Sequence, residues 1–130
     1  MNGHNYRKFR LSDKFISQYE DKEVPWGPVG YITYKRTYSR LLSERDSTAV
    51  GTEEWFQTCR RVIEGMFDMQ KRHVSKLGLE WIDSKSQKTA KDAYDRLFNL
   101  KWTPPGRGLW MMGTKFVEER TAAGLFNCAF

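Results

Sequence analysis

The most constraining feature of the sequence is a long helical pattern between residues 52 and 78. Thr52 is a residue type that often caps helices, and Glu53 and Glu54 follow where the helix dipole favours acidic side chains. Gly78 is typical of a helix C-terminus. The apolar positions between these limits mostly follow i, i+3, i+4 spacing: Trp55, Phe56, Cys59, Val62, Ile63, Met66, Phe67, Val74 and Leu77. The pattern predicts a long amphipathic helix whose apolar face needs partners.

Two further stretches predict helices that could cover this face. One begins at Ser12 or Asp13 and reaches about residue 20, and the other begins at Asp83 or Ser84 and reaches about residue 100. Residues 1–10 are polar and basic, and we expect them to fray. The side chains expected to face inward are Phe15, Ile16 and Tyr19 from the first helix, and Ala90, Ala93, Tyr94, Leu97 and Phe98 from the second.

The stretch from residue 29 to about residue 42 allows two interpretations. Its tyrosine, isoleucine and threonine content favours a strand. Its apolar residues, however, do not alternate cleanly and do follow helical spacing, so we predict a helix. A turn precedes it, because two prolines and a glycine interrupt residues 24–28, and a polar loop over residues 43–51 follows. Residues 1–100 are therefore expected to form a helical N-terminal region.

Residues 101–130 have a different character. Pro104 and Pro105 fix φ and remove two backbone donors, and Thr103, which precedes a proline, is expected to be extended. Arg107 lies between two glycines that permit close backbone approach, so the segment is predicted to be a loop. The apolar run over residues 125–130 resembles a buried strand and carries Cys128. One strand cannot make a sheet, so we expect it to be completed from elsewhere.

Composition narrows the class of protein. A chain of 130 residues fits one domain, and a net charge of +6 favours anionic partners such as nucleotides, nucleic acid or acidic protein surfaces. The two cysteines, Cys59 and Cys128, do not make a disulfide framework, so a reducing compartment is expected. No run of eighteen apolar residues is present. A cytoplasmic protein without a membrane span is the expectation.

Each candidate site residue also has a structural explanation. A lone cysteine such as Cys128 in an apolar strand is usually a small buried hydrophobic residue. The same explanation is stronger for Cys59, which lies on the apolar face of a predicted helix. His4 and His73 have no companion ligands at metal spacing, so no metal site is predicted. Arg107 is a candidate anion contact, and a structural loop arginine is an equal alternative.

The segment from Tyr34 to Arg40 mixes three cations with two tyrosines. One alternative function is therefore a small basic nucleic-acid-binding protein that depends on Lys35, Arg36 and Arg40. The favoured interpretation is an amphipathic helix whose tyrosines pack and whose cations stay in water. Nucleic acid is consequently not an expected partner, since this alternative also leaves residues 103–114 unexplained.

Four blocks of sequence resemble the N-terminal part of adenosylcobalamin-dependent (class II) ribonucleotide reductases, especially the monomeric ribonucleoside-triphosphate reductases. They occur in the family's order and together cover most of the chain after residue 24. The blocks are W-G-P-V-G-Y-I-T-Y-K-R-T-Y-S-R (26–40), G-T-E-E-W-F-Q-T-C-R-R-V-I-E-G (51–65), T-P-P-G-R-G-L-W-M-M-G-T (103–114) and L-F-N-C (125–128).

The resemblance implies a mainly α N-terminal layer that leads into the first strand of a ten-stranded α/β barrel, with residues 101–130 as substrate loop and strand. It implies thiyl-radical reduction of a ribonucleoside triphosphate, with adenosylcobalamin as cofactor and a thioredoxin-type reductant. Cys128 matches one of the two reducing cysteines, and Thr103 and Asn127 match substrate-binding positions. Pro105 departs from the family, which has a small polar residue there.

The sequence stops two residues after Cys128, whereas the family's barrel and its radical-forming and second reducing cysteines lie downstream. We therefore expect the chain to lack activity alone and to need the remaining part of the reductase, which also binds most of the cofactor. A truncated, an intein-interrupted and a split enzyme stay open as origins. A non-catalytic interaction fragment is the other alternative function.

Overall fold

The structure, a computed structural model, describes residues 6–115 and 117. Over this range the chain forms helices joined by irregular segments, and its β pairing is limited to one isolated antiparallel bridge between Leu41 and Thr52. The elements in chain order are α1 (Asp13–Ser17), α2 (Pro28–Thr37), the 3-10 helix η2 (Leu42–Glu44), α3 (Trp55–Lys76), α4 (Asp83–Phe98) and α5 (Gly106–Met111). The predicted helical N-terminal layer is confirmed. The predicted strand over residues 125–130 lies outside the described residues.

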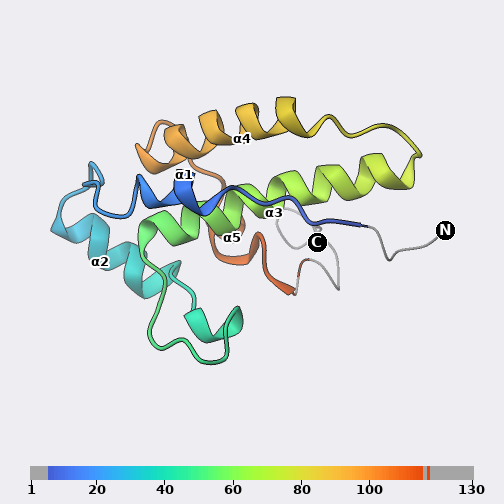
Figure 1. The fold of residues 1–130 in the computed structure, drawn as a ribbon. Helices are drawn as coiled ribbons and strands as arrows, with labels where there is room; N and C mark the ends of the chain where they lie inside the picture. Colours follow the sequence, from blue (N-terminus) through green and yellow to red (C-terminus); the bar gives the residue numbers. More distant parts are fainter. Residues whose placement is uncertain (1–5, 116, 118–130) are drawn as a thin grey trace.

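Helix α3 is the central element of this arrangement. Helix α4 runs antiparallel along it, and α5 packs against it as well (Figure 1). Gly78 ends α3 as predicted, because its φ of +71° lies in the left-handed region that favours glycine. The chain can then turn back to begin α4 at Asp83.

The core lies between α3, α4 and α1. Cys59, Val62 and Ile63 of α3 and Tyr94 and Leu97 of α4 are completely buried. Aromatic rings fill the space around them, with Tyr19 in edge contact with Phe15, Tyr94 and Phe98. Two polar atoms in this core are satisfied by backbone carbonyls: the Tyr94 hydroxyl donates to Phe56 and the Trp55 indole donates to Phe98.

Helix α2 confirms the prediction of a helix rather than a strand, but it ends at Thr37 rather than near residue 42. Tyr34 is its buried residue and stacks on Trp26. Val29 and Ile32 stay 78% and 54% exposed. Helix α2 therefore faces the core through Tyr34.

The predicted cap at Thr52 is wrong. The N-cap of α3 is Glu54, which forms a capping box with Gln57. Thr52 lies before the helix, where it pairs with Leu41 and its hydroxyl accepts a hydrogen bond from the Lys35 ammonium. Glu53 is buried instead of facing solvent in the first turn.

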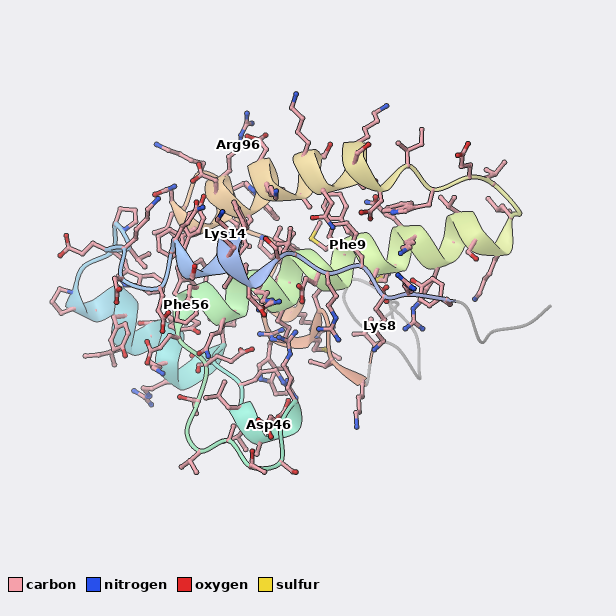
Figure 2. All side chains as sticks on the ribbon, in the orientation of Figure 1. Lys8, Phe9, Lys14, Asp46, Phe56 and Arg96 are labelled. Atoms are coloured by element: carbon pink, nitrogen blue, oxygen red, sulfur yellow. The ribbon has the colours of Figure 1, made fainter. Side chains whose placement is uncertain are left out.

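The N-terminal segment, residues 6–11, is packed rather than frayed, which corrects the expectation for this part of residues 1–10. Phe9 and Leu11 are each 2% exposed, and the segment runs in extended form along α3 (Figure 2). The amides of Phe9 and Leu11 donate to the carboxylates of Asp68 and Glu64, at 2.9 and 2.8 Å. An extended segment has no ladder of its own, so these carboxylates satisfy its backbone.

We expect Asp68→Asn to destabilise the chain in a pH-dependent way. Burial alone would raise the pKa of Asp68, but hydrogen bonds from Tyr6, the Phe9 amide and Arg72 lower it below its ordinary value. The carboxylate's contribution is therefore complete above the unfolded pKa of about 3.9 and is lost as pH falls through the lower folded pKa. Urea unfolding at pH 7 should show a loss of about 1–3 kcal/mol, as for a hydrogen bond to a charged group.

The matched control is Asp92→Asn, because Asp92 forms an exposed pair with Arg96 on α4. It should change the free energy of unfolding by less than about 1 kcal/mol. An Asp68→Asn deficit that stays constant from pH 7 to pH 2.5 would contradict the assignment of the effect to the charge.

Candidate functional site

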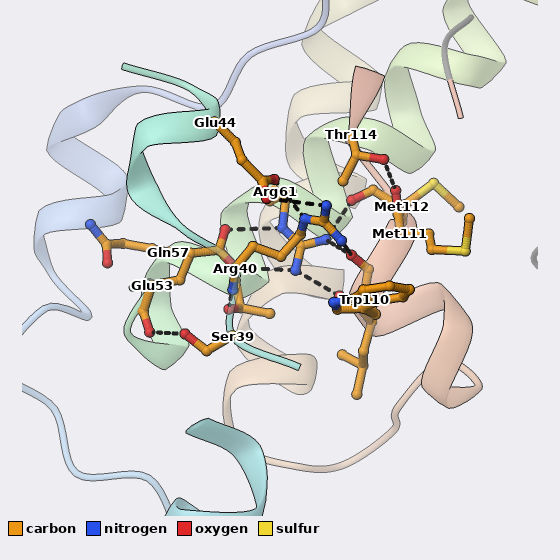
Figure 3. A network of polar contacts seen from close by, with 12 residues as sticks. Ser39, Arg40, Glu44, Glu53, Gln57, Arg61, Trp110, Met111, Met112 and Thr114 are labelled. Atoms are coloured by element: carbon orange, nitrogen blue, oxygen red, sulfur yellow. Dashed lines mark hydrogen bonds and ion pairs between the residues drawn. The ribbon is translucent and has the colours of Figure 1, made fainter. Parts of the chain in front are cut away.

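The segment that leads toward the predicted strand is fixed to α3 by Arg61. Its guanidinium, with a side chain 2% exposed, donates to the carbonyl oxygens of Leu109 and Met112, each at 2.7 Å, and of Trp110 at 3.3 Å (Figure 3). These carbonyls lie at the C-terminal end of α5, where helical carbonyls lack intrahelical partners. A cation is the favoured charge at that end.

Glu53 completes this arrangement by pairing with Arg61 in two-pronged geometry, at 2.9 and 3.1 Å. Its carboxylate also accepts from the Thr58 hydroxyl at 3.0 Å and the Arg40 amide at 3.1 Å. The Glu53 side chain is 3% exposed, so the pair is buried on both sides. We call Arg61, Glu53 and the three carbonyls of α5 the Arg61 junction.

Arg40 supports the same end of α5 from the surface. It donates to the Trp110 carbonyl at 3.0 Å, and its guanidinium lies 4.9 Å from the centre of the Trp110 ring. Glu44 pairs with it at 2.7 Å. Lys35 is also engaged, in an ion pair of 2.9 Å with Glu54. Two of the three cations of the possible nucleic-acid surface therefore serve internal contacts.

Two glycines allow the backbones to meet beside the junction. Gly113 has a φ of +79°, and a Cβ there would overlap the Arg61 carbonyl oxygen. A Cβ on Gly65 would lie 2.6 Å from the Cα and the amide nitrogen of Gly113. The chain thus passes α3 at backbone contact before Thr114, whose hydroxyl donates to the Met111 carbonyl at 2.6 Å.

The predicted loop is partly a helix. Thr103 is exposed and lies in irregular backbone, whereas Arg107 is exposed on the first turn of α5 rather than in a glycine-flanked loop. The reason is local: Pro105 is the N-cap of α5, and a proline at a helix start removes no needed hydrogen bond. Gly108 then allows close packing on Pro104, since a Cβ there would lie 3.1 Å from the proline ring.

The remaining predicted site residues, Asn127 and Cys128, and the second cysteine, Cys59, stand differently. Asn127 and Cys128 lie outside the described residues. Cys59 is completely buried, and burial raises the pKa of its thiol well above the ordinary value. Glu53 adds to this rise and Arg61 opposes it. The interpretation of Cys59 as an unreactive core residue agrees with this environment.

Within the part of the chain that the structure describes, no three histidine, cysteine, aspartate or glutamate side chains gather as a metal site would require. None of the helices in the same range is both long and apolar enough to cross a bilayer.

The Arg61 junction was not among the residues predicted from sequence. Arg61 lies at the border of the apolar pattern of α3, next to Val62, and resembles an ordinary boundary cation there. Glu53 was interpreted as a first-turn acid. The one available signal is that both residues fall inside the 51–65 block on which the resemblance rests.

The described helices pack around α3, and Arg61 fixes α5 and the residues after it on this helix. Comparison with known proteins gives the family. The family model for the ribonucleotide reductase alpha domain matches residues 11–114. The chain therefore belongs to the ribonucleotide reductase family.

Individual relatives agree with this family. The chain is 40% identical over 127 residues to a probable adenosylcobalamin-dependent ribonucleoside-triphosphate reductase of Dictyostelium discoideum, covering 95% of this chain and 16% of that protein. An adenosylcobalamin-dependent ribonucleoside-triphosphate reductase of Euglena gracilis is 37% identical, with 95% and 17% covered. The Lactobacillus leichmannii enzyme of that name is 37% identical, with 92% and 16% covered.

A solved structure is similar as well. The crystal structure of a B-12 dependent (class II) ribonucleotide reductase matches with a TM-score of 0.68 and 32% sequence identity, over 82% of this chain and 14% of that one. The resemblance to class II reductases is thereby confirmed. The chain spans about one sixth of the length of the curated relatives it matches.

We expect Arg61→Met to be among the most destabilising substitutions in the chain. It leaves the Glu53 carboxylate buried without its partner and the carbonyls of Leu109 and Met112 without their side-chain donor, and removing one member of a buried pair costs about 3–5 kcal/mol. Adding Glu53→Leu should recover part of the loss, because the unpaired charge is removed. Urea unfolding of the single and double variants measures both effects.

The control for that experiment is Arg96→Met, which breaks the exposed pair with Asp92 and should cost less than about 1 kcal/mol. Equal losses for Arg61→Met and Arg96→Met would contradict the buried pair.

Gly65→Ala gives a second test, in which the sign of the change in the free energy of unfolding distinguishes the two possible outcomes. Alanine in a helix interior is ordinarily more stable than glycine by about 1 kcal/mol. Here the added methyl group meets the Gly113 backbone, so we expect a net loss of about 1–3 kcal/mol from overpacking. Ser75→Ala, at an exposed position of the same helix, should leave stability equal or slightly higher. A more stable Gly65→Ala chain would exclude the backbone contact.

Proposed function

We propose that the chain supplies the N-terminal region of an adenosylcobalamin-dependent ribonucleoside-triphosphate reductase. The printed names of the relatives from Dictyostelium, Euglena and Lactobacillus support the substrate class and the cofactor. The observation that carries the proposal is the Arg61 junction, because it fixes α5 and Gly113 on α3 and so sets where the chain departs toward Asn127 and Cys128. The enzyme is proposed to work in the cytoplasm.

In this proposal Cys128 is one of two reducing cysteines. A thiyl radical removes the ribose 3′ hydrogen and restores it at the end of the turnover. The 2′ hydroxyl leaves as water while Cys128 and a second cysteine together give up two electrons and form a disulfide. A thioredoxin-type dithiol then returns the disulfide to two thiols and is itself oxidised. The radical-forming cysteine and the second reducing cysteine belong to the rest of the reductase.

The substrate contacts are proposed for three residues, Thr103, Asn127 and Arg107. Thr103 and Arg107 are exposed on the segment that the junction fixes, which supports their access to a ligand. Residues 101–130 would form the substrate segment and first barrel strand, and residues 1–100 the helical region behind it. The ten-stranded α/β barrel is completed by the remaining polypeptide.

The described residues do not fit adenosylcobalamin. A cavity of about 550 Å³ that they form has charged residues at nine of its thirteen lining positions, whereas a macrocycle needs broad apolar walls. Contacts with the cofactor are therefore assigned to the remaining polypeptide, where the cofactor supplies the radical.

Reconstitution tests this function directly. The chain is mixed with a polypeptide that supplies the remaining sequence of a related reductase, together with adenosylcobalamin, a ribonucleoside triphosphate and a dithiol, and deoxynucleotide is measured. Activity is expected only in the mixture. Cys128→Ser should abolish turnover, because serine cannot form the disulfide.

Cys59→Ala is the matched control, since it removes the other thiol of the chain but leaves the proposed chemistry intact. Turnover should persist in this variant. A folded and matched mixture that stays inactive, or one whose activity survives Cys128→Ser, would favour the non-catalytic interaction fragment instead.

A further inference from the structure

A cavity of about 550 Å³ with many charged residues lies between the N-terminal segment, α3, residues 40–45 around η2 and the residues that follow α5. Its walls come from four segments far apart in sequence, which fixes their charges relative to one another. Six cationic residues and three acidic ones line it, so the lining is net positive. The cations are Lys8, Arg10, Arg40, Arg45, Arg61 and Lys115.

The three carboxylates of this lining are already engaged by the protein. Glu44 pairs with Arg40. Asp68 accepts from Tyr6 and the Phe9 amide, and Glu64 accepts from the Leu11 amide at 2.8 Å and pairs with Arg60. Asp68 and Glu64 are therefore committed to holding the N-terminal segment, and Glu44 is committed to Arg40.

Arg45 differs from the other arginines of the cavity. Arg61 and Arg40 are held by Glu53 and Glu44, whereas the Arg45 side chain makes no hydrogen bond or contact ion pair within the described residues. Its backbone amide donates to the Leu42 carbonyl at the C-terminal end of η2. A guanidinium offers five donors, and here they remain available to a ligand.

The surroundings of Arg45 are also electrostatically unfavourable for a lone cation. It keeps much of its surface exposed, but the part against the cavity is desolvated, and this burial lowers its pKa below the ordinary value. Glu64 and Glu53 oppose the shift, and the charges of Arg61 and Arg10 add to it. Arginine stays protonated at neutral pH regardless, so a bound anion would relieve this repulsion.

Arg10 supplies a second adjustable cation. Its side chain is 63% exposed and approaches Glu64 only to 3.5 Å, and that Glu64 oxygen, Oε1, is buried and accepts no hydrogen bond. The pair is therefore loose, and Arg10 can turn toward a ligand at little cost.

We propose that this cavity binds a phosphate-bearing ligand, with Arg45 as its principal contact and Arg10 as its second. Planar guanidinium groups match phosphate oxygens in two-pronged geometry, which favours phosphate over a monatomic anion. The volume lies within the range of about 300–1,000 Å³ common for small-molecule sites, so a polyphosphate or a nucleotide fits. The site requires neither Cys128 nor turnover, so it stands apart from the proposed reductase reaction.

Titration of the whole chain tests the site. Sodium tripolyphosphate, ATP and adenosine are each added at constant ionic strength, with calorimetry for the affinity and thermal unfolding for the stabilisation that ligand binding confers. Tripolyphosphate and ATP should bind saturably and raise Tm, and adenosine should do neither. Binding of tripolyphosphate alone would support a phosphate site without nucleoside contacts, and binding of ATP without tripolyphosphate would overturn it.

Arg45→Gln should weaken binding at least about 10-fold, the scale of a hydrogen bond to a charged group. The affinity of Arg45→Lys should lie between those of the unchanged chain and Arg45→Gln, since lysine keeps the charge but cannot make the two-pronged contact of a guanidinium. Arg96→Gln is the control of equal charge change, because Arg96 lies on α4, across the molecule from Asp46 beside Arg45 (Figure 2). Circular dichroism verifies that each variant is folded. Equal weakening by Arg45→Gln and Arg96→Gln, or no saturable binding, would overturn the proposal.

Discussion

The structure depends on the buried ion pair between Arg61 and Glu53. Taking both charges out of water costs several kcal/mol per ion, so the pair is sustained only by excellent geometry and full hydrogen bonding. Both conditions hold: the contact is two-pronged, and the remaining donors and acceptors meet the α5 carbonyls, the Thr58 hydroxyl and the Arg40 amide. One pair thereby joins α3, the segment before it and α5.

Helix α3 uses the same device in its next turns. Asp68 and Glu64 accept the amides of the N-terminal segment, just as Arg61 donates to the carbonyls of α5. In each case a charged side chain of a regular helix satisfies backbone groups of a segment that has no ladder of its own. The helix therefore organises its neighbours through polar contacts as well as through its apolar face.

Periodicity was sufficient to predict α3 and α4, because each buries a consistent row of side chains. It also favoured a helix for α2, although Tyr34 is the one residue that this helix buries. It failed where a residue's partner is distant in sequence. Thr52 is a residue type that often caps helices, but here it pairs with Leu41. The N-terminal segment was expected to fray, because its own sequence does not show that carboxylates of α3 accept its amides. Arg107 was placed in a loop because glycines and prolines suggest irregular backbone, although Pro105 starts a helix. The family blocks, not the periodicity, suggested the roles of Asn127 and Cys128.

The contact between Gly65 and Gly113 has a consequence for protein engineering. Side chains can change rotamer to absorb a small displacement, but two backbones in direct contact cannot. The spacing between α3 and the departing chain is thus a hard limit rather than an adjustable distance. If residues 103–114 are grafted onto another helix, that helix needs a glycine at the position equivalent to Gly65. Positions 65 and 113 should therefore vary only together in a recombined library.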